Sequence, residues 1–219
     1  MMNSKNVPIS VFLFLFGFNF NVFAQDFYFG NDLSYVNQME DCGADFKEFG
    51  NPKDVYQIYA DHGNNLVRVR LWVTPAWQNS ISQPDGVKGQ YSDFEDVKET
   101  IKRSKEAGMQ VLLDFHYSDF WADPGRQVLP NDWYSVGPNE DALADSVYNY
   151  THRVLNKLDT AGLMPEMVQV GNETNRGMMR HRSMNKDYKG QEFLSDDWSR
   201  HAKLFNAGIQ AVRDVSAES

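Results

Sequence analysis

The amino-acid sequence predicts an α/β fold built on a parallel sheet. Strand-like and helix-like segments alternate four times between residues 25 and 219, and the strand-like segments are nearly continuous apolar runs. This is typical of parallel strands buried on both faces. Two architectures fit, a doubly wound open sheet and a (β/α)8 barrel. A dinucleotide-binding sheet is disfavoured, because Gly30-Asn31-Asp32 after the first strand lacks the GxGxxG spacing.

Residues 1–24 have the features of a secretory signal peptide. Lys5 supplies the positive charge, residues 11–18 form an apolar run, and Val22-Phe23-Ala24 places compact residues before a cleavage point at Gln25. The run is too short for a transmembrane anchor. We therefore expect cleavage after Ala24, a mature region at residues 25–219, a secreted or periplasmic location and no membrane attachment after cleavage.

The composition and charge of the sequence limit the classes of binding partner. The 219 residues carry a formal net charge of −9 with no basic cluster, which argues against nucleic acid and anionic membranes. The single cysteine, Cys42, excludes an internal disulfide and a metal site made of several thiolates. We expect Cys42 to pack as a small buried hydrophobic residue, with a catalytic thiol as the alternative.

The first half of the pattern begins with an aromatic and apolar run at residues 27–33, which predicts the first strand. Asn51 and Pro52 have the character of an N-cap and a first-turn proline for a helix that ends at Gly63. Residues 66–73 (LVRVRLWV) predict the second strand.

The second half repeats the pattern. Ser92 and Glu95 fit a capping box for a helix that ends at Gly108. The remaining expected elements are a strand at 110–116, an irregular segment at 117–138, a helix at 140–161, a strand at 167–173 and a last helix capped by Ser195.

Polar residues follow the ends of the predicted strands, where both architectures place their sites. These residues are Asn31 and Asp32; Arg68, Arg70 and Trp72; Asp114, His116, Asp119 and Trp121; and Asn172 and Glu173. Arg68, Arg70 and Trp72 alternate and so share one face of their strand. A buried arginine needs a carboxylate partner, either in a functional centre or in a purely structural ion pair.

Other readings of these residues stay open. Asp114 and His116 share a face, but His116 could also be a core histidine, and the sequence has no His-x-His strand or His-Glu-x-x-His helix. We therefore predict neither a catalytic metal nor a cofactor. Trp72 and Trp121 could pack in the core or form platforms for sugar rings.

Three strings resemble a known family. GNE, at residues 171–173, is similar to the acid/base motif of the large clan of retaining glycoside hydrolases built on (β/α)8 barrels. LVRVRLWVTP (66–75), DFHYSDFWADPGRQVLP (114–130) and VQVGNETNRGM (168–178) together resemble the arabinogalactan endo-β-1,4-galactanase family, glycoside hydrolase family 53. The resemblance runs from about residue 27 to the end of the sequence and implies the first four βα units of the barrel, a half-barrel.

The resemblance also implies roles. Glu173 would be the general acid/base, and Asn172 would hydrogen-bond the sugar 2-hydroxyl. Arg68 or Arg70 would support the nucleophile. The residues lining the substrate subsites would be His116, Asp119 and Trp121, with Trp72 as a further platform. The substrate would be β-1,4-galactan, the side chain of pectin, or arabinogalactan.

The sequence departs from the family at two points. Thr174 follows GNE where an aliphatic residue is more usual, and the nucleophile, a glutamate at the end of the seventh strand, has no counterpart. We therefore expect this chain by itself to be an inactive fragment. The alternatives are a non-catalytic carbohydrate-binding half-barrel and a metal-dependent barrel hydrolase. Taken alone, Asn172 and Glu173 also fit a helix N-cap pair.

Overall fold

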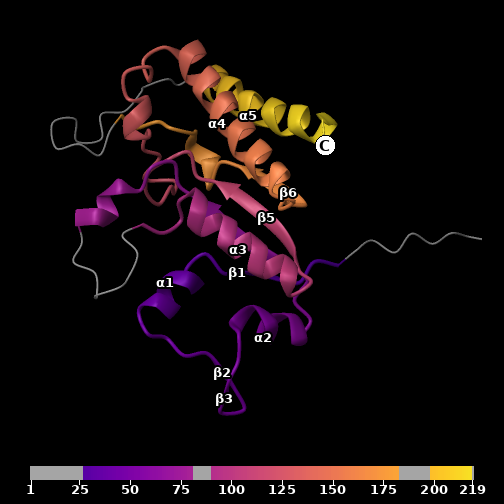
Figure 1. The fold of residues 1–219 in the computed structure, drawn as a ribbon. Coiled ribbons are helices and arrows are strands. Elements are labelled where there is room, and N and C mark those ends of the chain that lie inside the picture. Colours follow the sequence, from indigo (N-terminus) through magenta and orange to yellow (C-terminus); the bar gives the residue numbers. More distant parts are fainter. Residues whose placement is uncertain (1–26, 81–89, 183–197, 219) are drawn as a thin grey trace, which may run out of the picture.

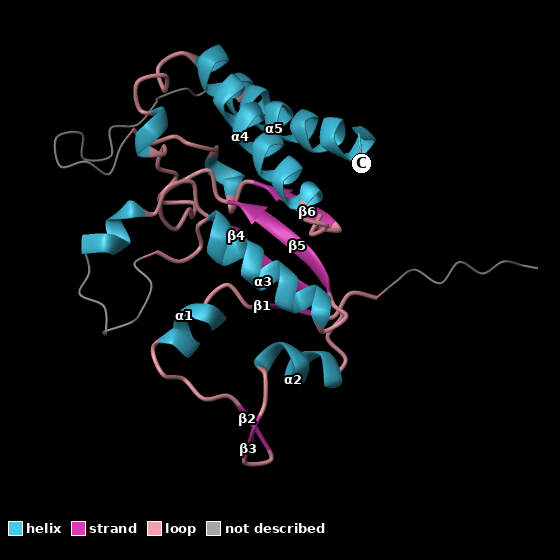
Figure 2. Ribbon diagram, viewed as in Figure 1, coloured by secondary structure: helices cyan, strands magenta, loops and turns pink. Residues whose placement is uncertain are grey.

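The computed structural model describes residues 27–80, 90–182 and 198–218, so the predicted signal peptide and Ser195 lie outside the described residues. Its centre is a four-stranded parallel sheet in the order β1-β4-β5-β6 (Figures 1 and 2). The strands are β1 (Gly30–Asp32), β4 (Leu66–Leu71), β5 (Gln110–Phe115) and β6 (Met167–Val170). The prediction of four parallel strands that neighbour one another in chain order is confirmed.

Five α-helices connect and cover the strands. They are α1 (Val36–Asp41), α2 (Val55–Asp61), α3 (Phe94–Glu106), α4 (Glu140–Thr160) and α5 (Ser199–Glu218). The smaller elements are a hairpin of β2 (Lys47–Glu48) and β3 (Asn51–Pro52) and the 3-10 helices η1 (Ala76–Ser80), η2 (Asn131–Trp133) and η3 (Thr174–Arg176). Helices α4 and α5 lie side by side, and the hairpin projects beyond α1 and α2 (Figure 1). None of the helices in the described ranges is both long and apolar enough to cross a bilayer.

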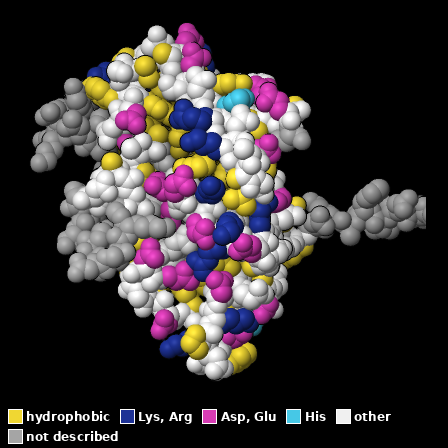
Figure 3. Space-filling model, in the orientation of Figure 1, with side chains coloured by type: hydrophobic (Ala, Val, Ile, Leu, Met, Phe, Trp, Pro, Cys, Tyr) yellow, Lys and Arg dark blue, Asp and Glu magenta, His cyan; other side chains and the backbone are white. Residues whose placement is uncertain are grey.

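The two faces of the sheet differ in chemistry. Val69, Leu113 and Phe115 point to one face and pack with α3, α4 and α5 in the main core. Arg68 and Asp114 lie on the opposite face. The outer side of α3 carries a mixture of acidic and basic side chains (Figure 3).

The expectation that the strands are buried on both faces holds only in part for the described residues. Leu66, Arg68 and Leu112, on the face away from the helices, are partly exposed. The reason is that the helices that pack on the strands lie on the other face, where the main core forms. Toward the ends of the strands the polar face is nevertheless closed, because Arg70 and His116 are each 1% exposed.

Helix α5 approaches the end of β6 very closely. A Cβ atom added at Gly208 would lie 2.6 Å from Val170 Cγ1 and 2.9 Å from the Tyr117 hydroxyl oxygen. Tyr117 itself is fully buried and bonds Thr151 of α4 through its hydroxyl, at 2.7 Å. Glycine at position 208 therefore lets the last helix dock where the strand delivers Asn172.

Two of the predicted helix starts are displaced along the chain. The N-cap of α2 is Asp54, whose carboxylate accepts the Tyr56 and Gln57 N–H groups, and Asn51 pairs in β3 instead. The carboxylate outcompetes the earlier asparagine because it reaches two free N–H groups of the first turn.

The capping box of α3 is shifted by one residue. Asp93 accepts the Asp96 N–H at 2.9 Å, and the Asp96 carboxylate accepts the Ser92 N–H at 2.7 Å. Ser92 adopts a positive φ of 58°, which aims its N–H back at the helix. The reciprocal bonding is therefore present, but an Asp pair provides it rather than Ser92 and Glu95.

Three further expectations need correction. The first strand begins at Gly30, and Phe27 before it is 80% exposed. Cys42 is exposed rather than buried, because it lies at the end of α1, a helix that the sequence pattern did not predict. Strand β6 ends at Val170, so Asn172 and Glu173 belong to the turn that follows it.

Candidate active site

Arg68 is the centre of a polar network at the strand ends. Its guanidinium contacts Asp32 at 2.5 Å, the carboxylate of Asp114, and the Asn172 amide oxygen at 2.8 Å. These partners come from the ends of β1, β5 and β6. Arg68 therefore has the carboxylate partners that its place on a buried strand predicts, and it also joins three strands.

The tautomer of His116 follows from its neighbours. Its Nδ1 accepts the Trp72 Nε1–H at 3.3 Å and the Ala122 N–H at 3.2 Å. The ring proton therefore lies on Nε2, which is 3.0 Å from the Asp114 carboxylate, although the N–H does not point straight at that oxygen. His116 is thus a fixed member of the network. The negative charge of Asp114 is balanced by the guanidinium of Arg68.

Arg70 has different surroundings from Arg68. It is 1% exposed, and its guanidinium carbon lies 3.9 Å from the ring centre of Tyr35, 4.8 Å from Trp72 and 5.2 Å from Trp121. Among the described residues it makes no salt bridge, and its Nε has no hydrogen-bond partner. Burial lowers the pKa of Arg70, while Tyr35 and the charge of Asp32 oppose that effect.

Asn172 is held rigidly. It is 4% exposed; its Nδ2 donates to the Ala122 carbonyl at 2.7 Å, and its Oδ1 accepts from Arg68 and, at 3.3 Å, from Gln169. Because these contacts use none of the N–H groups that a helix would leave free, the helix-capping interpretation of Asn172 is wrong. We expected Arg68 or Arg70, His116, Asn172 and Glu173 to converge at the strand ends. The network brings together Arg68, His116 and Asn172, and Glu173 is outside it.

Glu173 follows Asn172 in a left-handed conformation, with φ of 47°. Its side chain is exposed. The turn thus separates two neighbours, fixing the amide inside the network and presenting the carboxylate to solvent.

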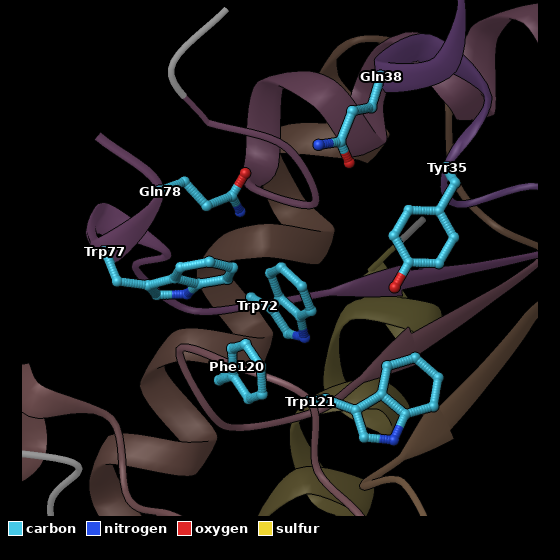
Figure 4. A pocket seen from close by; sticks show the side chains of 7 residues that line it. All are labelled: Tyr35, Gln38, Trp72, Trp77, Gln78, Phe120 and Trp121. Atoms are coloured by element: carbon cyan, nitrogen blue, oxygen red, sulfur yellow. The ribbon is translucent and has the colours of Figure 1, made fainter. Parts of the chain in front are cut away.

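An aromatic pocket of about 440 Å³ lies beside this network (Figure 4). Its lining residues come from the segments after β1, β4 and β5: Tyr35, Gln38, Trp72, Trp77, Gln78, Phe120 and Trp121. Trp72 and Phe120 stack at 5.9 Å between ring centres, and Trp77 meets Phe120 edge-on at 5.0 Å. Trp72 is buried at 5% exposure, whereas Trp121 is half-exposed, so Trp121 is the better placed of the two predicted platforms.

Asp119 fixes the loops around the pocket. It is 7% exposed, and its two carboxylate oxygens accept the N–H groups of Thr74 at 2.9 Å and Asn131 at 2.8 Å. Its carbonyl accepts the Trp77 Nε1–H at 2.7 Å. Burial raises the pKa of Asp119 to about 6, against the lowering effect of the two N–H groups. The observed contacts of Asp119 are therefore with the protein backbone and Trp77.

The family model of glycosyl hydrolase family 53 matches residues 28–219. The chain belongs to this family. An arabinogalactan endo-beta-1,4-galactanase of Cellvibrio japonicus (strain Ueda107) is 43% identical over 88% of this chain and 46% of its own length. An endo-beta-1,4-galactanase of Bacillus subtilis (strain 168) is 36% identical over 88% of this chain and 41% of its own length.

Solved structures agree with the family assignment. One, from work on two fungal beta-1,4-galactanases, has a TM-score of 0.69 at 34% identity and covers 85% of this chain and 49% of that one. The GH53 catalytic domain of Ignisphaera aggregans has a TM-score of 0.68 at 30% identity over 85% and 48% of the two chains. Family 53 neighbours imply a (β/α)8 barrel type of fold. The chain spans a little under half the length of the curated relatives that it matches.

Several contributors to the family 53 site were not predicted. Tyr35 covers Arg70, Trp77 lines the pocket, and Gln127 donates to the Asn172 carbonyl at 2.7 Å. Trp77 lies in the short 3-10 helix η1 and Gln127 in a loop, neither of which shows a period in the sequence, and Tyr35 directly precedes α1, which was not predicted. The signal that could have found Gln127 is its place in the most specific string, DFHYSDFWADPGRQVLP.

Proposed function

We propose that the full-length protein, meaning the whole product of the gene that encodes this chain, is a retaining endo-β-1,4-galactanase. Its substrate is the β-1,4-galactan of pectin side chains or of arabinogalactan. The observation that carries the proposal is the pairing of a rigidly held Asn172 with an exposed Glu173 at the end of β6. Family 53 membership and the names of the relatives support it.

In this proposal Glu173 donates a proton to the leaving glycosidic oxygen and then, as a base, activates water. Retaining hydrolysis needs a second carboxylate about 5–5.5 Å from the first, which attacks the anomeric carbon. Asn172 has one Nδ2 hydrogen on Ala122 O and a second one available for the sugar 2-hydroxyl. Arg68 and Gln169 fix the orientation of that amide by donating to its oxygen.

The nucleophile is not assigned to any described residue, and we propose that it lies outside this sequence. Of the two arginines, Arg70 is the better candidate to meet it. Arg68 already has two carboxylates and an amide as partners, whereas Arg70 is buried without a salt bridge to a described residue. A carboxylate brought to Arg70 would supply the missing counter-charge. The four strands of the parallel sheet would then be the first half of the barrel.

The aromatic pocket would hold one galactosyl residue of the chain. Trp77 and Trp121 offer ring faces for the apolar C–H groups of the sugar, and a volume of about 440 Å³ falls within the range of small-ligand sites. The Gln38 amide lies at the rim with its head toward this space (Figure 4). The Gln78 amide is already bonded to the backbone of Tyr91 and so shapes the wall.

Replacing Glu173 by glutamine tests the proposal in the full-length protein. We expect turnover of galactan to fall about 10²–10⁴-fold, because a glutamine cannot donate the proton, while galactan binding is retained. Reducing-end release and calorimetric binding measure the two effects. Glu95→Gln, on the exposed side of α3, is the matched control and should leave both unchanged. Unaltered turnover in the Glu173 variant would show that another group is the acid.

A carbohydrate-binding protein without turnover is the second candidate. The exposure of Glu173 favours it, because the described residues do not enclose its side chain as a water-excluding catalytic site would. Galactan binding by the wild-type full-length protein, without release of reducing ends at any pH between 4 and 8, would establish this alternative.

We also propose that the protein is exported and that residues 1–24 are removed. The charge and apolar run at the start of the sequence support this. Determination of the N-terminus of the exported protein should give Gln25, and a protein retained in the cytoplasm with an intact leader would contradict it.

A further inference from the structure

We propose that Gln127 and Arg200 are positioning residues for Glu173. They hold residues 171–179, which we call the Glu173 turn, in a strained backbone conformation that places the carboxylate against the glycosidic oxygen. This inference rests on the proposed function of Glu173 as the acid. Neither residue lies on the strand that ends at the turn, and neither was a candidate from the sequence.

The Glu173 turn has an unusual backbone. Four of its nine residues have a positive φ: Gly171 at 83°, Glu173 at 47°, Gly177 at 104° and Met179 at 49°. Glutamate and methionine rarely adopt this region, because their Cβ atoms crowd the backbone. A conformation of this kind persists only where surrounding contacts determine it, and such residues concentrate at functional sites.

Gln127 holds the beginning of the turn. It is 2% exposed, and its Nε2 donates to the Asn172 carbonyl at 2.7 Å and, more weakly, to the Glu173 carbonyl at 3.5 Å. The backbone of Gln127 is fixed in turn by His181, which lies just beyond the turn and donates its N–H to the Gln127 carbonyl at 2.8 Å. One glutamine therefore ties the start of the turn to the segment after its end.

Arg200 holds the end of the turn. It projects from α5 and is 6% exposed; Nη1 donates to the Met178 carbonyl at 3.0 Å and Nη2 to the Met179 carbonyl at 3.1 Å. Burying a guanidinium has an unfavourable free energy. If packing were the only requirement, an apolar side chain would fill the same space at a lower free-energy cost. The forked head bonds two successive carbonyls at once, which a lysine cannot reproduce in the same geometry.

The consequence is specific to one chemical step. A general acid must lie within hydrogen-bonding reach of the leaving oxygen, and a displacement of about 1 Å can reduce the rate by about 10². Loosening the turn should therefore impair reactions that need leaving-group protonation. It should spare a substrate whose leaving group departs without a proton.

The experiment compares two substrates in the full-length protein. The variants are Gln127→Met and Arg200→Met, with the milder change Arg200→Lys, and the matched control is Lys203→Met on the same helix, where Lys203 is partly exposed and contacts Asp141. For each variant, kcat/KM is measured on β-1,4-galactan and on a 2,4-dinitrophenyl β-galactobioside. The ratio kcat/KM reports the first bond cleavage, so later water attack does not obscure it.

We expect kcat/KM on galactan to fall by about 10² in Gln127→Met and Arg200→Met, with a much smaller change on the dinitrophenyl substrate. Arg200→Lys should lie between wild type and Arg200→Met. Azide, which attacks without a general base, should restore kcat on the dinitrophenyl substrate. An equal loss on both substrates would overturn the inference, since loss of folded enzyme or of general packing lowers both alike.

Glu173→Gln, measured beside these variants, separates the two claims. If it shows no leaving-group dependence, the proposed function fails. If it does and the Gln127 and Arg200 variants do not, only the positioning inference fails. Circular dichroism and gel filtration check the fold, and Arg200→Lys and Gln127→Met carry the test if Arg200→Met does not fold.

Discussion

Replacing Asp119 by asparagine should change how the stability of the protein depends on pH. Asp119 is 7% exposed, and burial raises its pKa from 3.8 to about 6. A raised pKa means that the folded protein holds the proton more tightly than the unfolded chain does. The stabilising contribution is therefore complete below about pH 4 and is lost as the pH rises through about 6.

The magnitude follows from the size of that change. Each pKa unit corresponds to about 1.4 kcal/mol, so ionisation of Asp119 should lower the free energy of unfolding by about 3 kcal/mol between pH 4 and pH 8. Asparagine has nearly the same shape and does not ionise. However, the Thr74 and Asn131 N–H groups bond different oxygens of Asp119, and the asparagine Nδ2 group replaces one of these acceptors with a donor. The variant should therefore be less stable than wild type near pH 4, and the difference should shift by about 3 kcal/mol in favour of the variant between pH 4 and pH 8.

Urea unfolding followed by tryptophan fluorescence at five pH values measures this in the full-length protein. The quantity of interest is the difference between wild type and variant at each pH, because the titrations of all other groups cancel in it. Asp93→Asn, at the partly exposed N-cap of α3, is a control for loss of an aspartate that bonds a backbone N–H. A difference that stays constant with pH, or that favours wild type increasingly toward pH 8, would refute the reasoning.

Two further changes test the packing of the site. Arg68→Met should lower the free energy of unfolding by about 3–5 kcal/mol, because it leaves the fully buried Asp114 without its counter-charge; addition of Asp114→Asn should recover part of the loss, and a single variant as stable as wild type would contradict the network. Gly208→Ala should destabilise by about 1–3 kcal/mol despite the better helix propensity of alanine, since the new Cβ would lie 2.6 Å from Val170. Thermal unfolding measures both, and an alanine variant that is more stable than wild type would show that α5 shifts without loss.

The sheet could be predicted from the sequence because its signal is strong and local. Residues 66–73 and 110–116 are apolar runs bounded by glycine-containing turns, and the helices between them show clear periods. Parallel pairing then follows, since each connection contains a helix. The exact ends of the strands were harder to predict, for a physical reason. Phe27 is as apolar as any core residue, but it precedes the point at which β1 meets β4 and stays exposed.

Helix starts were misplaced where adjacent residues compete for the same role. Asn51 and Asp54 are both good N-caps, as are Ser92 and Asp93, and a sequence pattern does not show which one reaches the free N–H groups. The outcome depends on the path of the chain into the helix, which long-range contacts set. In the first case Asn51 pairs with Glu48 in the β2–β3 hairpin, whose turn is Phe49-Gly50, and so it does not cap α2.

Some residues of the candidate site could be predicted from the sequence and others could not. Arg68, His116 and Asn172 were predictable because they lie at or beside strand ends, and the parallel sheet brings those ends together. Gln127 and Arg200 were not, because their role is to bond the carbonyls of an irregular turn from a loop and from a distant helix. The two arginines on β4 show a further limit. Their alternation predicts a shared face, but only the structure shows that Arg68 has carboxylate partners and Arg70 aromatic ones.

The network also explains why the amide and the carboxylate at the end of β6 differ so sharply in exposure. The Asn172 amide oxygen accepts hydrogen bonds from Arg68 and Gln169, and its Nδ2 donates one to the Ala122 carbonyl, so β4, β6 and the loop after β5 determine its position. Any rotation of that amide would break bonds to all three. Glu173, one residue later, has a left-handed backbone conformation, and its side chain is exposed and outside that network. The strained turn is therefore the feature that lets one strand end fix an amide and still present a carboxylate to a substrate.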